Sequence, residues 1–141
     1  MKCLAIVGWR RFTNYPLLCK HVDQWIAEHG RPDSIVSGGA QGADSMGARY
    51  GREHKIHVDE LLPEWYVGPE HKYNPRAGLD RNSDIVAACT HAIAFPCVLG
   101  SGTQDTIDKL HKAGKPVVVI DVDPNAKVPL HLAFGSYPRK C

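Results

Sequence analysis

The chain has 141 residues, a length typical of one domain, and its 43% hydrophobic and 23% charged residues are ordinary for a globular protein. The net charge of +2 and the dispersed lysines and arginines do not indicate a polyanion-binding stripe, so we expect nucleic acid not to be a partner. No apolar run long enough for a membrane helix and no signal pattern occurs, so we expect a cytoplasmic protein without a membrane partner. The five cysteines form no CxxC pair, and we expect neither a metal site nor a cofactor.

The first half of the chain alternates between short apolar runs and segments with helical spacing. Lys2–Val7 is a mostly apolar run that ends at Gly8, as expected for a buried first strand. A helix follows, with Pro16 in its first turn, where proline is tolerated, and Gly30 at its end. The next elements are expected as a strand at Asp33–Val36, a helix at Ala43–His54 and a strand at Ile56–Leu62.

The second half begins with an irregular segment and then resumes the alternation. Pro63–Pro75 is rich in proline and aromatic residues, which favours an ordered loop. Its aromatic side chains either pack this loop or stack on a base: Trp65, Tyr66 and Tyr73. The later elements are expected as a helix at Ala77–Cys89, a strand at His91–Phe95, a helix at Thr103–Ala113 and a strand at Pro116–Val122.

Alternating strands and helices predict an α/β fold with a parallel sheet and helices on both faces. In such a sheet the loops that lead from strands into helices lie at the carboxyl edge, where free N–H groups of helix N-termini bind ligands. We assign residues 1–124 to this domain and leave the C-terminal tail, 125–141, unassigned.

The loop Ser37–Asp44 connects the second strand to the second helix and contains three glycines. Gly38, Gly39 and Gly42 can adopt positive φ and let a ligand approach the backbone, and the helix start adds partial positive charge. These features favour phosphate binding over a merely tight turn. For Asp44 two interpretations remain open: a favourable interaction with the helix dipole, or binding of a ribose hydroxyl or a metal-bound water.

The loop Gly100–Asp105 lies in the same position after the fourth strand. Gly100 and Gly102 provide flexible backbone donors at a helix N-terminus. Ser101 and Thr103 add hydroxyl groups, unless their role is only to cap the helix. Two such loops at one edge of the sheet predict an anion pocket.

A third segment adds charge around the start of the helix Ala77–Cys89. Lys72, Arg76 and Arg81 are positive where the helix dipole disfavours positive side chains, so a ligand is expected to compensate. We interpret Arg81 as a bidentate ligand for phosphate or carboxylate, and Asn82 as a ligand for a base or sugar. The alternative is a solvent-exposed segment with Arg81 in a surface ion pair.

In order and spacing, these motifs resemble those of the SLOG superfamily, and in particular its small YspA-type domains, many of them bacterial or phage-encoded. The matching residues are Gly8-Trp9-Arg10, Ser37–Asp44, Trp65, Ala77-Gly78 with Arg81-Asn82, and Ala94-Phe95-Pro96 followed by Gly102-Thr103. The likeness covers about Met1 to Asp121. It implies a Rossmann-like three-layer sandwich with a mostly parallel sheet of about five strands. It also implies a pocket for a nucleotide or an ADP-ribose compound, and it adds Gly8, Arg10 and Pro96 to the candidate ligand-binding residues. We further expect the chain to form a homo-oligomer.

The superfamily also includes the Smf/DprA proteins and the Lonely Guy phosphoribohydrolases, which cleave the N-glycosidic bond of nucleoside monophosphates. Lonely Guy enzymes carry Pro-Gly-Gly-x-Gly-Thr-x-x-Glu and an arginine on the preceding helix. Here the arginine position matches Arg81, but the glutamate position is Thr106, so Asp105 or Asp44 would have to supply the carboxylate that stabilises an oxocarbenium-like charge.

Two functions therefore stand as hypotheses. The favoured one is a nucleotide sensor or binding module that uses both glycine-rich loops. The alternative is an N-glycosidic hydrolase or transferase that acts on a nucleotide. Single-stranded DNA binding, suggested by the Smf/DprA likeness, is disfavoured by the near-neutral charge.

Overall fold

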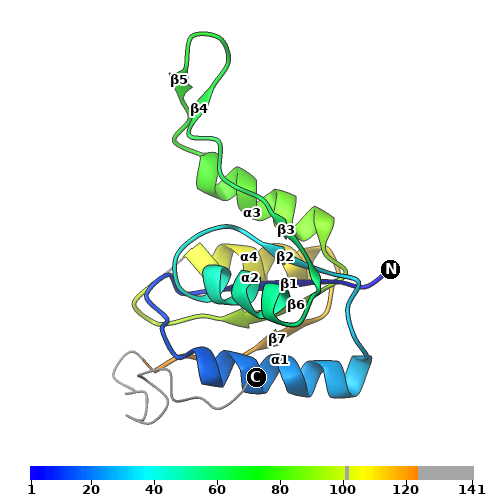
Figure 1. Cartoon of the computed structure of the whole chain (residues 1–141). Helices are drawn as coiled ribbons and strands as arrows, with labels where there is room; N and C mark the ends of the chain where they lie inside the picture. Colours follow the sequence, from blue (N-terminus) through cyan, green and yellow to red (C-terminus); the bar gives the residue numbers. More distant parts are fainter. Residues whose placement is uncertain (101, 124–141) are drawn as a thin grey trace.

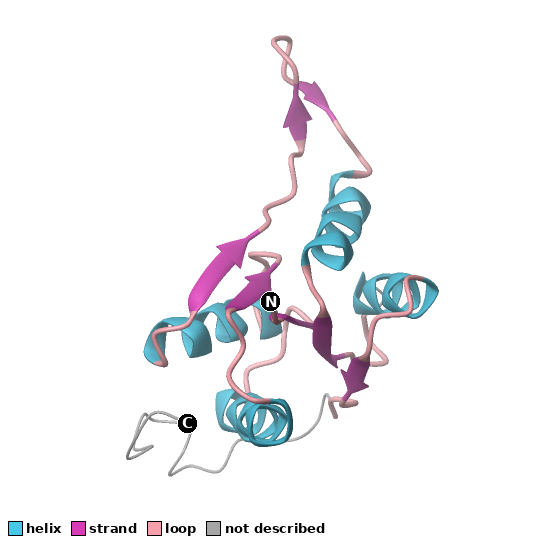
Figure 2. Ribbon diagram, turned by 90° about the vertical axis from the view of Figure 1, so that its right-hand side faces the viewer, coloured by secondary structure: helices cyan, strands magenta, loops and turns pink. Residues whose placement is uncertain are grey.

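Five parallel strands form the central sheet of the computed structural model, which describes residues 1–100 and 102–123 (Figure 1). The strands lie in the order β3 (His57–Glu60), β2 (Ser34–Ser37), β1 (Cys3–Gly8), β6 (His91–Phe95) and β7 (Val117–Val119). Helices α1 (Tyr15–His29) and α2 (Ala43–Glu53) cover one face, and α3 (Ala77–Ala88) and α4 (Gly102–Lys112) cover the other (Figure 2). The predicted α/β sandwich with a parallel sheet is confirmed.

The two faces of the sheet follow from the alternation of side chains along β1. Leu4 and Ile6 pack into one core cluster with residues of α1 and α2. Ala5 and Val7 pack into the other with residues of α3 and α4. Because all four side chains are at most 3% exposed, β1 is buried on both sides, which explains its nearly continuous apolar sequence.

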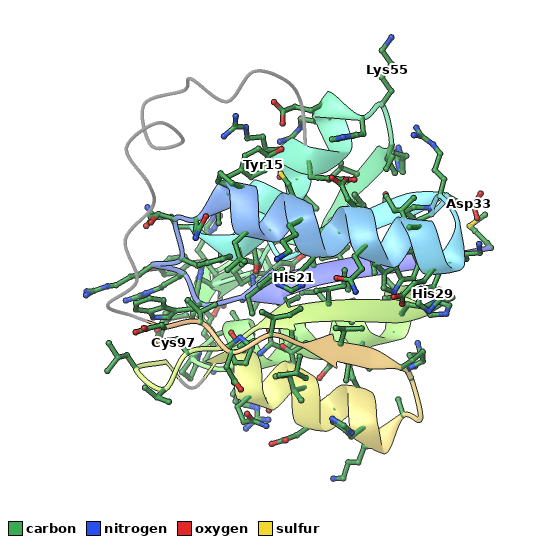
Figure 3. The ribbon with its side chains drawn as sticks, turned by 90° about the horizontal axis from the view of Figure 1, so that it is seen from below. Tyr15, His21, His29, Asp33, Lys55 and Cys97 are labelled. Atoms are coloured by element: carbon green, nitrogen blue, oxygen red, sulfur yellow. The ribbon has the colours of Figure 1, made fainter. Side chains whose placement is uncertain are left out.

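The strand order places a crevice at the centre of the sheet. After β1 the chain moves outward to β2 and β3, and it then returns to the other side of β1 to form β6 and β7. The connections therefore diverge at the carboxyl ends of β1 and β6, and a parallel sheet binds ligands at such a switch point. In Figure 3, Cys97 marks this end of the sheet, and His29 and Asp33 lie at the opposite end.

Helix α2 lies close to the sheet because it presents small residues to it. A Cβ atom added to Gly47 would lie 2.8 Å from Ile6 Cβ, which leaves no room for a side chain. Ala43, in the first turn of α2, is fully buried against the same core. The close packing brings the N-terminus of α2 directly beside the end of β1.

The segment Pro63–Pro75, predicted as a loop, contains a short antiparallel hairpin of β4 (Tyr66–Val67) and β5 (Lys72–Tyr73). Only two residues of each strand pair, too few to produce a recognisable alternation in the sequence. The hairpin projects from the domain beside the start of α3 (Figure 1).

The last strand is shorter than expected, because β7 covers only part of the predicted run Pro116–Val122. The backbone beyond it still follows β6, with hydrogen bonds from Ile120 N to Ala94 O and from Val122 N to Pro96 O. The tail 125–141 and Ser101 lie outside the described residues. Among the helices that are described, none has the length and apolar character needed to cross a membrane.

Candidate functional site

A cavity of about 570 Å³ opens at the carboxyl ends of β1 and β6, at the switch point of the sheet. This volume is typical of small-molecule sites. Its walls come from the loop after β1, the start of α2, residues 81–85 of α3, the loop before α4 and the first turns of α4. Its described lining residues are Val7, Gly8, Trp9, Arg10, Arg11, Ala40, Asp44, Arg81, Asn82, Ile85, Leu99, Gly100, Gly102, Thr103 and Thr106.

Eight of the predicted site residues line this cavity: Gly8, Arg10, Asp44, Arg81, Asn82, Gly100, Gly102 and Thr103. Seven others do not line it: Ser37, Gly38, Gly39, Gly42, Lys72, Pro96 and Asp105. Ser101 cannot be placed, because it lies outside the described residues. The fold therefore joins three segments that are distant in the sequence into one site. Several of the glycines lie outside the cavity and pack against the residues that line it.

Gly38 shows how a residue outside the cavity shapes it. A Cβ atom added there would lie 2.5 Å from Asp44 Oδ2 and 2.7 Å from Arg81 Nη1. Both side chains thus lie against the bare backbone at this position. Gly42 has φ +77°, and an added Cβ would lie 2.4 Å from Trp9 O, so a glycine is also needed where this loop meets the one after β1.

Ser37 is fully buried and organises its own loop. Its hydroxyl donates a hydrogen bond to Asp44 O at 2.9 Å and accepts one from Gly39 N at 3.2 Å. These contacts hold the loop onto the first turn of α2. The structure therefore places Ser37 as a loop-stabilising residue away from the cavity wall.

Asp44 is a buried carboxylate in the cavity wall, with 5% of its surface exposed. Burial disfavours the charged form and raises the pKa of Asp44 to about 6. The Arg81 guanidinium and the backbone N–H groups of Gly8, Gly38 and Ala40 act in the opposite direction, toward a lower pKa. Asp44 is thus mostly ionised at neutral pH, yet it titrates close to the physiological range.

Arg81 reaches the cavity from α3 and is held by two neighbours. Its Nη1 donates to Gly38 O at 2.5 Å, and its Nε donates to Asn82 Oδ1 at 3.2 Å. Asn82 is 7% exposed, and its Nδ2 donates to Asp105 Oδ2 at 3.1 Å. Since no described carboxylate forms an ion pair with Arg81, its remaining donors are available to a ligand.

Asp105 belongs to this network rather than to the cavity wall. Its carboxylate contacts Lys109 Nζ at 2.9 Å as well as Asn82. Burial acts to raise the pKa of Asp105, but the hydrogen bonds from Lys109 and Asn82 outweigh it, and the pKa lies below its ordinary value. Asp105 therefore orients Asn82, which in turn orients Arg81.

Thr106, and not its neighbour Asp105, lines the cavity. It is 2% exposed, one helical step further along α4, and it lines the cavity without a charge. The position that would carry a glutamate in the Lonely Guy motif is thus occupied here by a lining residue without a carboxylate. Among the described lining residues, Asp44 is the only carboxylate.

Seven lining residues were not among the predicted site residues: Val7, Trp9, Arg11, Ala40, Ile85, Leu99 and Thr106. Trp9 and Arg11 are the two of them that lie in the loop after β1. They flank the predicted Arg10, just after the end of β1 at Gly8. The position at the carboxyl end of a central strand was the signal that could have identified them. Lys72, in contrast, was predicted for the site but lies on β5 of the projecting hairpin.

Sequence comparison relates the chain to one family and to one phage protein. A family model described as the YspA, cpYpsA-related SLOG family matches residues 3–67. The Gene 61 protein of Mycobacterium phage D29 is 31% identical over 85 residues, which cover 60% of this chain and 68% of that protein.

Solved structures share the fold at low sequence identity. DprA from Streptococcus pneumoniae has a TM-score of 0.67 and 18% identity over 88% of this chain and 51% of that one, so the chain spans about half its length. DprA from Helicobacter pylori has a TM-score of 0.63 and 21% identity over 89% and 68% of the two chains. The protein TM1055 has a TM-score of 0.60 and 20% identity over 83% and 72%.

The expectation that nucleic acid is not a partner, which was based on the low net charge, was wrong. Helicobacter pylori DprA, which shares this fold, has a single-stranded DNA binding mode. Net charge averages over the whole surface, whereas binding depends on local groups, and here Arg10, Arg11 and Arg81 gather at one cavity. A net charge of +2 is therefore no ground for exclusion.

Proposed function

The chain belongs to the SLOG superfamily, and we propose that it binds a nucleotide of the nucleoside monophosphate or ADP-ribose type in the cavity between β1 and β6. One observation carries this proposal: three arginines, Arg10, Arg11 and Arg81, share the cavity with a single buried carboxylate, Asp44. A nucleotide suits this combination, because it has anionic phosphate oxygens for the arginines and neutral hydroxyl groups that donate to a carboxylate.

The phosphate fits best beside the start of α4. Gly102 and Thr103 lie in the first turn of this helix, whose leading N–H groups have no partner within the helix. Arg10, an exposed residue of the loop after β1, lines the same cavity and can supply a further positive charge. Free N–H groups and an exposed guanidinium together suit a phosphate whose oxygens stay partly in contact with water.

The ribose fits best beside Asp44. An ionised carboxylate repels a phosphate, so the wall around Asp44 favours a neutral part of the ligand that can donate hydrogen bonds. Vicinal hydroxyl groups have this property. Arg81, held against Gly38 next to Asp44, can span the ribose and the phosphate.

We expect binding without cleavage of the ligand. Thr106 cannot stabilise an oxocarbenium-like charge as a carboxylate does, and Asp105 is occupied by Lys109 and Asn82. The alternative function, an N-glycosidic hydrolase, would have to use Asp44. Incubation with AMP should therefore release no free base and no ribose 5-phosphate. Release that disappears in Asp44→Asn would establish the hydrolase instead.

The test of the binding function is calorimetric titration and thermal shift with AMP and ADP-ribose. We expect one of them to bind and to raise the melting temperature, and Arg81→Ala to weaken that binding at least tenfold, because hydrogen bonds to charged groups contribute about 1.5–3 kcal/mol. Arg52→Ala is the matched control, since Arg52 pairs with Glu60 at the surface and does not line the cavity. Failure of both nucleotides to bind would contradict the proposal.

A second candidate is that the bound nucleotide belongs to a single strand of nucleic acid. The observation that favours it is the projecting hairpin, whose base carries Trp65, 43% exposed, and whose strands carry Tyr66 and Tyr73, 65% and 56% exposed. The Trp65 and Tyr73 rings are stacked, with centroids 6.3 Å apart, and exposed aromatic faces stack on bases without sequence preference. Helicobacter pylori DprA is a precedent for single-stranded DNA on this fold.

Fluorescence anisotropy with a labelled thymidine oligonucleotide at low and high salt distinguishes the two candidates. If the strand binds, affinity should fall with salt and should fall further in the Tyr66→Ala, Tyr73→Ala double variant, while AMP binding to that variant stays normal. An oligonucleotide that does not bind at low salt would leave only the nucleotide function.

A further inference from the structure

Trp9 contributes an aromatic wall to the cavity, the only one from the described lining residues. Its backbone is fixed on both sides: Trp9 N donates to Phe95 O at 2.9 Å, and Trp9 O accepts from Phe12 N at 3.1 Å. The indole is partly buried and packs against the core cluster beneath α1 and α2. Trp9 is thus a fixed part of the site rather than a loosely placed surface residue.

The indole lies directly against the loop before α4. A Cβ atom added to Gly100 would lie 2.9 Å from Trp9 Cδ1 and 3.4 Å from Trp9 Nε1, so a glycine is needed for the ring to occupy this place. None of the described residues accepts a hydrogen bond from the indole N–H. The ring therefore has both an apolar surface and a polar group to offer a ligand.

The surroundings of Trp9 differ from those of Asp44. Leu99, the residue before Gly100, is 68% exposed and lines the same cavity, and Val7 and Ile85 add further apolar lining. Neither the ribose nor the phosphate of a nucleotide gains from such a surface. A planar, weakly polar ring does, because it is attracted to an aromatic face and loses little hydration there.

Resting on the proposed function, we propose that Trp9 is the base-binding residue and that the site selects ligands with an aromatic base over sugar phosphates. The base stacks on the indole, while Arg81 and the start of α4 hold the phosphate and Asp44 holds the ribose. The chemical class of the ligand is then a nucleotide with an intact base, and ribose 5-phosphate is a poor ligand.

The test compares AMP with ribose 5-phosphate by calorimetry on the wild-type chain, Trp9→Leu and Trp9→Phe. We expect the wild type to bind AMP at least tenfold more tightly than ribose 5-phosphate. Trp9→Leu should lose most of that preference, because only the base contact is removed, and Trp9→Phe should restore much of it. A circular dichroism melt of each variant identifies those that fold.

Fluorescence gives a readout that does not depend on a stability change. In Trp25→Phe, Trp65→Phe, the remaining tryptophan is Trp9, and AMP should change its emission while ribose 5-phosphate should not. If AMP binds the wild type and Trp9→Leu equally and leaves the emission unchanged, Trp9 is not the base-binding residue, although the cavity still binds nucleotides. If neither compound binds the wild type, the proposed function and this inference both fail.

Discussion

Replacement of Asp44 by asparagine should change how the stability of the protein depends on pH. Asp44 is 5% exposed, and its pKa is raised from 3.8 to about 6, chiefly by burial. Because the folded protein binds this proton more tightly than the unfolded chain does, ionised Asp44 costs the folded state about 3 kcal/mol at neutral pH. The stability that neutral Asp44 contributes is complete below about pH 4 and is lost as the pH rises through about 6.

The measurement is the free energy of unfolding in urea for the wild type and Asp44→Asn at several values between pH 4.5 and 7.5. Asparagine does not titrate, so subtraction of the two curves cancels the other ionisable groups. From the two pKa values, the variant should gain about 2 kcal/mol relative to the wild type across this range. If the asparagine amide forms poorer hydrogen bonds than the carboxylate, the variant loses the same unfolding free energy at pH 4.5 and at pH 7.5. Such a loss leaves the expected change between the two pH values unaltered.

The matched control is Asp84→Asn, an exposed residue on α3 that does not line the cavity. Its difference from the wild type should vary less with pH than that of Asp44→Asn. A difference between the wild type and Asp44→Asn that stays constant from pH 4.5 to 7.5 would refute the claim that burial raises the pKa of Asp44.

Two further substitutions test the packing that supports the site. Gly8→Ala should destabilise the fold by about 1–3 kcal/mol, because its Cβ would lie 2.7 Å from Ala43 Cβ. Gly102→Ala, whose added Cβ meets nothing within 4 Å, is its control, and equal urea midpoints would contradict this reasoning. Lys115→Met should cost about 1–2 kcal/mol, because Lys115 Nζ donates to Cys89 O at 2.7 Å, beside the C-terminus of α3. The exposed Lys112→Met should cost less, and a similar loss in both would show that this contact contributes little.

The secondary structure of the main sheet could be predicted because its causes are local. His91–Phe95 is a mostly apolar run that ends at Pro96, and its predicted boundaries are those of β6. Tyr15–His29 forms α1 around Pro16 in its first turn, with Gly30 at φ +87° after its end. The hairpin of β4 and β5 was missed, because two paired residues per strand leave too little pattern.

The candidate site could be predicted only in part, since a motif does not reveal which of its side chains reach a cavity. The glycine-rich loops mark the edge of the sheet at which the cavity opens, and Arg81 and Asn82 line that cavity. Asp105 was a candidate for the catalytic carboxylate, and in the structure its carboxylate contacts Asn82 and Lys109 outside the cavity wall. Helical geometry explains this, because Thr106, the next residue of α4, takes the place at the cavity wall.

The sequence by itself determined the class of fold, because apolar periodicity acts over a few residues. Its motifs also resembled those of the SLOG superfamily, and its glycine-rich loops indicated the edge of the sheet at which the cavity opens. Only the tertiary structure decided that Asp44 is buried beside Arg81, that Asp105 is withdrawn from the cavity and that Trp9 forms its aromatic wall. These properties arise from contacts between β1, α2, α3 and α4, which are distant in the sequence. Burial, which sets the pKa of Asp44, exists only once those elements have packed together.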